Sequence, residues 1–302
     1  MNIFYCDHFV LPLPEGHRFP MAKYTLLRER VAASELGEVH NMVVPEAASD
    51  EELLRVHDRE YLERVKAGTL SENEVRRIGF PWSPQMVERS RRSVGGTIAA
   101  CRSASNDGVA VNLAGGTHHA FADRGEGFCV FNDAAVAARA VQAEGHAERV
   151  LIIDCDVHQG NGTAAIFAED PTVFTFSIHG ANNFPFRKVE SDLDVPLPDG
   201  VVGNVYQNAL DEALDRLTKL GGIDLAIYLA GADPYINDRY GKLALYLDDL
   251  SKRDRTVIEW CRDMGMDVAT VMSGGYARNI DEIVDIHFST VRTTARFDTR
   301  TP

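Results

Sequence analysis

Residues 150–162 read VLIIDCDVHQGNG, an apolar run that passes directly into acids, a histidine and glycines. An unbroken series of aliphatic residues at 150–153 is typical of a strand buried on both faces of a parallel sheet. Side chains two residues apart in an extended chain point the same way, so Asp154, Asp156 and His158 share a face if the strand continues through them. Carboxylates and imidazole suit Zn²⁺ or Fe²⁺. The stretch therefore predicts a buried strand that ends at a metal site.

Short apolar runs of this kind alternate with longer amphipathic stretches along the chain. The predicted strands are residues 2–6, 109–112, 150–154, 172–178, 225–230 and 268–272. The predicted helices are residues 21–36, 84–105, 133–144, 204–220 and 247–264. Asn132 and Asp133 are suited to cap the third helix, and Gly265 is suited to end the last one. This alternation implies an α/β fold of three layers, a central parallel sheet flanked by helices, and no linker divides residues 1–302 into more than one domain.

Polar, glycine-rich segments follow the strands at their carboxyl ends. They read GGTHHA (115–120), DCDVHQGNG (154–162), SIHG (177–180), GADP (231–234) and SGGY (273–276). Ligands of open parallel sheets bind beyond these ends, so we expect the loops to converge on one site. A catalytic metal needs about three protein ligands and an open position, and Asp233 is the natural third ligand. Taken singly, each acid is better explained as a helix cap or as part of a surface ion pair than as a metal ligand.

The same loops carry groups suited to hydrolysis. His118 and His119 follow two glycines that permit an irregular backbone, and histidine transfers protons near neutrality. The Tyr276 hydroxyl can donate a hydrogen bond to a carbonyl that is becoming an oxyanion. Phe128, which directly follows Gly125-Glu126-Gly127, can wall a narrow channel. The alternatives are a solvated loop for the histidines, a cover over the sheet edge for Tyr276, and a core position for Phe128.

The composition excludes several classes of protein. The chain has 302 residues, of which 45% are hydrophobic and 25% charged, as in ordinary globular proteins. Its net charge of −14 disfavours nucleic-acid binding and suits cationic substrates such as lysine tails or polyamines, although acidity also serves solubility alone. The five cysteines lack a CxxC spacing, which argues against disulfides and a cysteine zinc site. We find neither a signal peptide nor an apolar stretch near the ~20 residues that span a bilayer, and expect a cytoplasmic protein.

Taken together and in this order, the loop motifs and GFCVFND (127–133) resemble the histone deacetylase family of the arginase/deacetylase superfamily. The resemblance extends from residues 45–47 and 57–61 to Ile280. Arginases share the fold, but their Asp-x-His-x-Asp order differs from the Asp-x-Asp-x-His found here. Within the family, three segments look like class IV and its bacterial relatives: QGNG (159–162), SGGY (273–276) and DRYGKL (238–243).

The resemblance implies a metal centre and a proton-transfer group. Position by position, Asp156, His158 and Asp233 would bind Zn²⁺, with Fe²⁺ as an alternative. His119 would act as general base and general acid, and Asn161 would hold it. Because Asn161 is neutral, His119 lacks a carboxylate partner and is easier to keep unprotonated as a base.

The remaining implied roles concern charge, substrate and potassium. His118, paired with Asp154, would stabilise charge, Tyr276 would polarise the acyl carbonyl, and Gly127 and Phe128 would line the acyl tunnel. A structural K⁺ would use Asp154, Asp156, His158, Ser177 and Ile178, several of them through main-chain carbonyls. A second K⁺ would fall near Phe167, Asp170 and Val173.

The expected activity is hydrolysis of an acyl-lysine amide, acetyl or longer fatty acyl, by a zinc-dependent deacylase. The resemblance to class IV implies that long acyl groups on lysine are better substrates than acetyl. Phe184 or Phe186 would then form the opposite wall of the groove, unless the loop is a surface turn with its aromatic rings packed inward. One alternative is an acetylpolyamine amidohydrolase on the same fold, and a more remote one is a catalytically silent module that binds acyl-lysine. The sequence leaves the oligomeric state open.

Overall fold

The computed structural model describes residues 1–299 and is built on one eight-stranded sheet. The strands are β1 (Asn2–Phe4), β2 (Asn41–Val43), β3 (Val109–Asn112), β4 (Val150–Asp154), β5 (Val173–Gly180), β6 (Leu193–Leu197), β7 (Leu225–Leu229) and β8 (Asp267–Val271). Every neighbouring pair is parallel, in the order β2-β1-β3-β8-β7-β4-β5-β6. The predicted parallel sheet is therefore confirmed.

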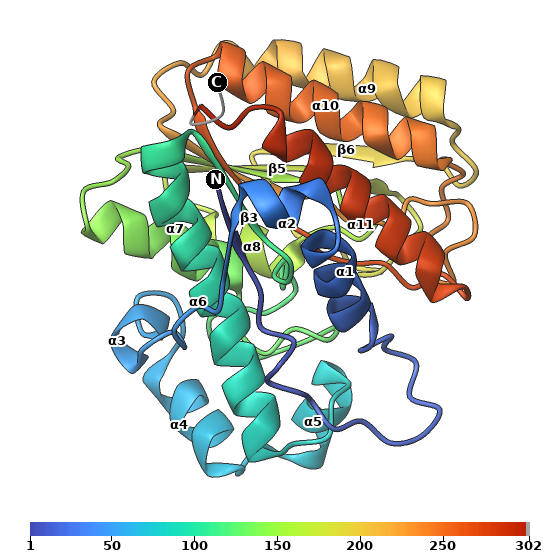
Figure 1. The fold of residues 1–302 in the computed structure, drawn as a ribbon. Helices are drawn as coiled ribbons and strands as arrows, with labels where there is room; N and C mark the ends of the chain where they lie inside the picture. Colours follow the sequence, from blue (N-terminus) through green and yellow to red (C-terminus); the bar gives the residue numbers. More distant parts are fainter. Residues whose placement is uncertain (300–302) are drawn as a thin grey trace.

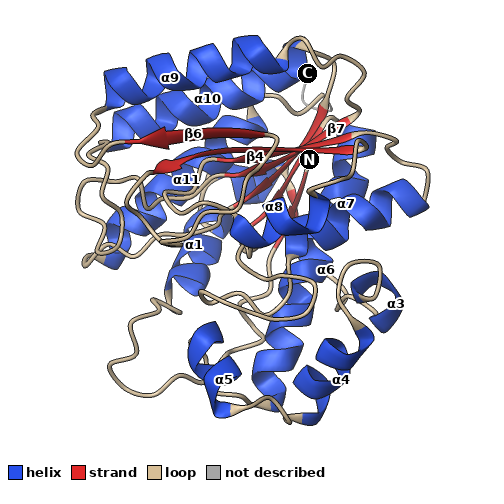
Figure 2. Cartoon of the chain, turned by 180° about the vertical axis from the view of Figure 1, so that it is seen from behind, coloured by secondary structure: helices blue, strands red, loops and turns tan. Residues whose placement is uncertain are grey.

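Helices cover both faces of this sheet (Figures 1 and 2). They are α1 (Lys23–Ala32), α2 (Glu35–Val39), α3 (Asp50–Leu53), α4 (Arg59–Ala67), α5 (Glu72–Ile78), α6 (Pro84–Asp107), α7 (Asp133–Ala143), α8 (Asn161–Phe167), α9 (Gly203–Leu217), α10 (Leu247–Asp263) and α11 (Ile280–Ala295). One core lies under α1, α9, α10 and α11, and a second lies under α6 and α7. Figure 1 shows α3, α4 and α5 grouped around one end of α6.

Strand β4 shows why two cores form. Its consecutive side chains alternate between the faces of the sheet: Leu151 and Ile153 join the first core, whereas Val150 and Ile152 join the second. Both faces of the strand are covered, so the sequence is apolar at every position and not only at alternate ones. This burial fixes where β4 ends, and with it the position of the loop that follows.

The structure corrects several predicted boundaries. The helix predicted over residues 21–36 is two helices, because Ser34 interrupts it and caps α2 by accepting a hydrogen bond from the Leu36 amide at 3.2 Å. Strands β2 and β6 were missed because both end the sheet and lack a continuous apolar run. Asn132 caps α7 as predicted, but Asp133 does not, since its carboxylate accepts hydrogen bonds from the 116–117 loop.

The sequence did not predict five of the helices: α3, α4, α5, α8 and α11. The first four are short, which gives them a weak helical pattern. Within residues 1–299, no helix has the length and apolar character needed to cross a membrane.

Candidate metal centre and active site

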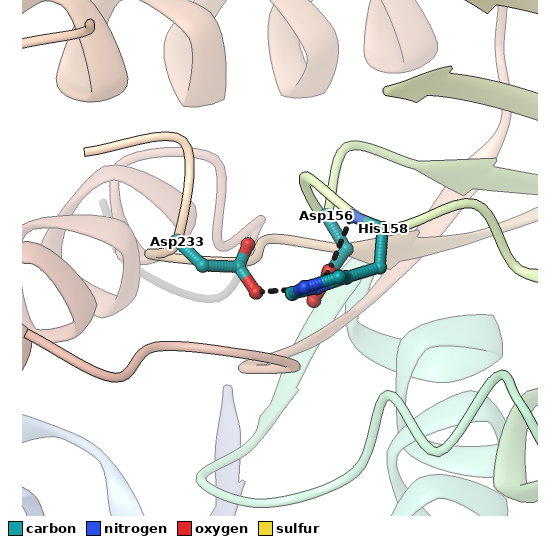
Figure 3. A group of neighbouring side chains, drawn as sticks. All are labelled: Asp156, His158 and Asp233. Atoms are coloured by element: carbon teal, nitrogen blue, oxygen red, sulfur yellow. Dashed lines mark hydrogen bonds and ion pairs between the residues drawn. The ribbon is translucent and has the colours of Figure 1, made fainter. Parts of the chain in front are cut away.

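Three potential metal ligands meet beyond the carboxyl ends of β4 and β7, which are neighbours in the sheet (Figure 3). Asp156 and His158 follow β4, and Asp233 follows β7. One ligand atom from each residue lies within 4.8 Å of the others. His158 Nδ1 is 2.9 Å from an Asp156 oxygen and 3.1 Å from an Asp233 oxygen. The structure thus brings together the three residues that the sequence singled out.

The local backbone that presents these ligands differs from the expected one. Strand β4 ends at Asp154, so Asp156 and His158 do not share a strand face. Instead, carboxylates accept hydrogen bonds from amides two residues further on: Asp154 from Asp156 at 3.1 Å, and Asp156 from His158 at 2.9 Å. Such Asx turns are a known local preference of aspartate, and here they fold the loop that holds the cluster.

The cluster suits a divalent cation. Asp156 and Asp233 are 1% and 0% exposed, and two adjacent carboxylates at that depth are costly unless a cation offsets them. Burial and the nearby charge of Asp156 raise the pKa of Asp233 to about 7. Two carboxylates and one imidazole form a donor set for Zn²⁺ or Fe²⁺ that leaves a coordination position open.

Further hydrogen bonds orient the carboxylates. Asp156 accepts from the Ser273 hydroxyl at 2.7 Å and from the Gly274 amide at 2.8 Å, and Asp233 accepts from the Val157 amide at 2.9 Å. Such outer contacts fix the direction of metal-binding groups.

The two consecutive histidines lie next to the cluster in different environments. His118 Nδ1 is 2.6 Å from an Asp154 oxygen, and His119 Nδ1 is 2.7 Å from Asn161 Oδ1. Burial alone would lower the pKa of His118, but Asp154 and Asp156 outweigh it and raise that pKa to about 9. Burial, then the neighbouring His118 and His158, hold the pKa of His119 well below its usual value. The two imidazoles therefore differ in proton affinity: the surroundings of His118 favour its charged form, and those of His119 favour its neutral form.

Two positions beside the cluster adopt left-handed backbone conformations that residues other than glycine rarely take. Phe128 has φ 66° and Ser273 has φ 56°, and they are the only non-glycine residues with positive φ in the described part of the chain. Such a conformation costs roughly 1–3 kcal/mol and persists where its surroundings enforce it. At Phe128 the enforcing contact includes an amide hydrogen bond of 2.7 Å to the Ile78 carbonyl.

A cavity of about 540 Å³ opens beside His119, Phe128 and His158. Its lining includes His119, Gly127, Phe128, His158, Phe184, Phe186 and Tyr276. Gly127 is required by the close approach of its neighbours, because a Cβ there would lie 2.6 Å from the His119 ring. Phe184 lies inside, with its ring centroid 4.9 Å from that of His119, whereas Phe186 is 88% exposed at the rim.

The residues predicted for potassium lie at the ends of β4 and β5. Strand pairing places Asp154 opposite Ser177, and Ile178 follows directly. At the second predicted position, the Asp170 amide donates to the Phe167 carbonyl at 3.0 Å, and its carboxylate is paired with Arg139. Both potassium sites stay predictions.

Lys23 supports the site from α1, where its side chain is buried and only 2% exposed. It was not predicted from the sequence. Its ammonium donates to the carbonyls of Ser273 at 3.3 Å and Gly275 at 3.4 Å, and lies 5.4 Å from the centre of the Tyr276 ring. Burial lowers the pKa of Lys23 to about 8. Lys23 shares the buried side of α1 with Leu27 and Val31, and this spacing of four residues was the available signal.

A second residue that was missed is Asp238, which holds the backbone of Tyr276. Its carboxylate accepts hydrogen bonds from the amides of Tyr276 at 2.6 Å, Tyr240 at 2.8 Å and Gly241 at 2.9 Å. The Arg239 side chain donates to the Tyr276 carbonyl at 2.9 Å. The 238–243 segment, read from the sequence only as a subgroup feature, therefore orients the tyrosine.

Arg253 links the two loops that carry the candidate metal ligands. It is fully buried on α10 and donates to the carbonyls of Gly231 at 2.7 Å and Cys155 at 3.2 Å. Its other nitrogens donate to Asp254 at 2.9 and 2.7 Å. This side chain links the loop after β4 to the loop after β7.

We expect Arg253→Met to destabilise the protein by about 3–5 kcal/mol, because it leaves the Asp254 carboxylate buried without its charge partner. Urea unfolding measures the change. Arg255→Met is the matched control, since Arg255 is an exposed residue on the same helix, and its effect should stay within about 0.5 kcal/mol. Equal stability of the two variants would show that Arg253 does not hold these loops.

Comparisons with known proteins agree with this geometry. Residues 17–291 match the family model of the histone deacetylase domain. An uncharacterized protein of Picosynechococcus sp. is 44% identical over 285 residues, which is 94% of this chain and 95% of the relative. Histone deacetylase 2 of Arabidopsis thaliana is 30% identical over 278 residues, which is 89% of this chain and 72% of the relative.

Solved structures give the same fold. The HDA15 HD domain aligns with a TM-score of 0.83 at 20% identity, over 98% of this chain and 91% of that one. An HDAC homolog complexed with SAHA aligns with a TM-score of 0.83 at 24% identity, over 97% and 83%. The arginase/deacetylase fold predicted from the sequence is confirmed. The chain is a hydrolase that acts on amides, and it belongs to the histone deacetylase family.

Proposed function

We propose that this protein is a zinc-dependent deacylase that hydrolyses the amide of an acylated lysine to a free amine and a carboxylate. The observation that carries the proposal is the convergence of the Asp156, His158 and Asp233 cluster with His119 and Tyr276. The last two residues and His158 line one cavity. Zn²⁺ held by the cluster would supply Lewis acidity toward a water molecule and the acyl carbonyl.

His119 is suited to be the proton acceptor. Asn161 Oδ1 can only accept a hydrogen bond, so the proton of a neutral His119 sits on Nδ1 and Nε2 keeps its lone pair. With its pKa held low, the ring is available to take a proton from water as the amide carbon is attacked. The same nitrogen, or the adjacent charged His118, then returns a proton to the leaving amine.

Tyr276 is suited to donate a hydrogen bond to the acyl oxygen as that oxygen becomes negative. Burial, together with the carboxylates of Asp156 and Asp233, raises the pKa of Tyr276 well above its usual value. The hydroxyl therefore keeps its proton and remains a donor.

The walls of the cavity support an aliphatic acyl-lysine. Phe128 and Phe184 are aromatic, and Gly127 leaves room between them. We further propose membership in class IV, structural K⁺ at the predicted positions, and a preference for long acyl chains. We also propose that the protein is located in the reducing cytoplasm, in line with its five buried cysteines, none of which forms a disulfide.

A substrate panel tests the function. Metal-loaded protein should hydrolyse a myristoyl-lysine peptide with a higher kcat/KM than the acetyl-lysine peptide, because each buried methylene contributes about 0.8 kcal/mol. Both should exceed acetylputrescine. If acetylputrescine is the best of the three, the polyamine alternative replaces the proposal. Binding without turnover of any of them would identify a silent module. A tenfold advantage of acetyl over myristoyl would remove only the preference for long chains.

A further inference from the structure

The mouth of the cavity carries a charge opposite to that of the whole chain. The chain has 31 lysines and arginines against 45 acidic residues, which gives a net charge of −14. Among the residues that line the cavity, four are basic and one is acidic: Arg18, Arg76, Arg77, Lys242 and Glu126. The two carboxylates deeper in the site belong to the candidate metal cluster and would balance a bound divalent cation. The acidity of the chain as a whole therefore does not describe the charge that a substrate meets.

Part of this basic rim is anchored to the wall of the tunnel. The Gly127 amide donates to the Arg77 carbonyl at 3.0 Å, and the Phe128 amide donates to the Ile78 carbonyl at 2.7 Å. Helix α5 ends at Gly79, in a left-handed conformation, where a Cβ would lie 2.9 Å from the Phe128 ring. Arg77 is thus held at the mouth by the contacts that shape the tunnel.

The rim cations differ in how far they are neutralised. Arg76 pairs with Glu72 at 3.4 Å, and Lys242 lies 4.0 Å from an Asp199 oxygen. Arg18 and Arg77 are exposed, and neither has a carboxylate partner among residues 1–299. Their guanidinium groups are available to a bound molecule, and guanidinium pairs readily with carboxylate in a bidentate geometry.

We propose that the rim selects acylated amines whose amine portion carries carboxylates, such as acyl-lysine among acidic residues. This inference rests on the proposed amide hydrolysis and narrows its substrate class. A cleft lined by one sign of charge concentrates ions of the opposite sign and speeds their association. The same field disfavours a substrate that ends in an ammonium group, so it acts against acylated polyamines. Basic residues in the last turn of α5 also complement the helix dipole, a role that leaves substrate choice unchanged.

The test uses substrates that differ only in charge. The first pair is an acetyl-lysine peptide flanked by glutamates and its counterpart flanked by lysines. The second pair separates small molecules from peptides: 5-acetamidopentanoate, with a terminal carboxylate, against N-acetylputrescine, with a terminal ammonium on a chain of equal length. We expect the anionic member of at least one pair to have a kcat/KM about tenfold higher or more, with the ratio falling as salt is added.

Variants of Arg18 and Arg77 test whether these residues cause the preference for anionic substrates. Arg18→Gln with Arg77→Gln should reduce the anionic-to-cationic ratio of kcat/KM severalfold, mainly through KM. Lys252→Gln with Arg255→Gln removes the same two charges from exposed positions on α10 and should leave the ratio unchanged. Thermal unfolding and metal content verify that each variant is folded.

The outcomes separate the two proposals. If no member of either pair is hydrolysed by metal-loaded protein, the proposed function fails. If the two members of each pair are hydrolysed equally well, or the cationic member is preferred in both pairs, the function stands and the basic rim does not select the substrate. An unchanged ratio in the double variant would assign Arg77 to the helix dipole.

Discussion

Asp233→Asn protein is expected to lose its bound metal and its turnover together. Wild-type protein should bind about one Zn²⁺ or Fe²⁺ per chain, and the variant close to none. Of the three residues in the candidate cluster, Asp233 is the one outside the loop after β4, and its loss leaves one carboxylate and one imidazole. A catalytic site held by three protein ligands loses most of its affinity when one is removed. The asparagine keeps the shape of the side chain, which is fully buried.

Metal analysis and turnover should be measured on the same preparations, with unfolding curves to verify the fold. Asp156→Ala should behave in the same way. Asp199→Asn is the control, because this exposed carboxylate lies outside the cluster, and its metal content should match the wild type. Full turnover in metal-free Asp233→Asn protein would overturn the site assignment. Normal metal content in both cluster variants would show that the metal binds at another site.

The central strands could be predicted from the sequence because burial on both faces leaves a plain pattern. Strands β4 and β7 are apolar at nearly every position, and their residues divide between the two cores. Edge strands β2 and β6 lack this pattern, because β2 has no fully buried residue and β6 is buried only at its first and last residues. The sequence therefore predicted the strands that are buried on both faces and missed those at the edges of the sheet.

Residue type and spacing picked out the three residues of the candidate metal cluster, although the strand backbone assumed for them was wrong. Asp156 and His158 meet through Asx turns and not through strand alternation. The choice of residues was correct despite this error, because an aspartate that follows a buried strand can bind either a local amide or a cation. Predicting which of these conformations forms requires the contacts of Ser273 and Gly274, more than a hundred residues away.

The contacts of residues that support the site from a distance could not be predicted from local pattern, even where spacing places the residue on a buried face, as it does for Lys23. Lys23 reaches Ser273 across 250 positions, and Arg253 reaches Cys155 across 98. In sequence, each is a basic residue in a helix, and most such residues face solvent. Only the packing of α1 and α10 against the sheet turns them inward.

Tyr276→Phe protein is expected to keep its fold and metal but to lose kcat by about 10²–10³, the usual effect of removing one oxyanion donor. The substitution removes only the hydroxyl. The backbone bonds of Tyr276 to Asp238 and Arg239 remain, and the ring still packs beside Phe128 and Tyr240, with centroids at 6.0 and 5.2 Å.

Because the hydroxyl acts on a charge that develops only during the reaction, KM should change little. Tyr235→Phe is the matched control: it removes a hydroxyl that bonds Glu282 at 3.1 Å, away from the cavity, and should leave kcat unchanged. A rise in KM at constant kcat would make Tyr276 a substrate-binding residue. A fall in kcat with loss of metal would mean instead that the tyrosine supports the metal cluster, and the fall could not then be assigned to a lost oxyanion donor.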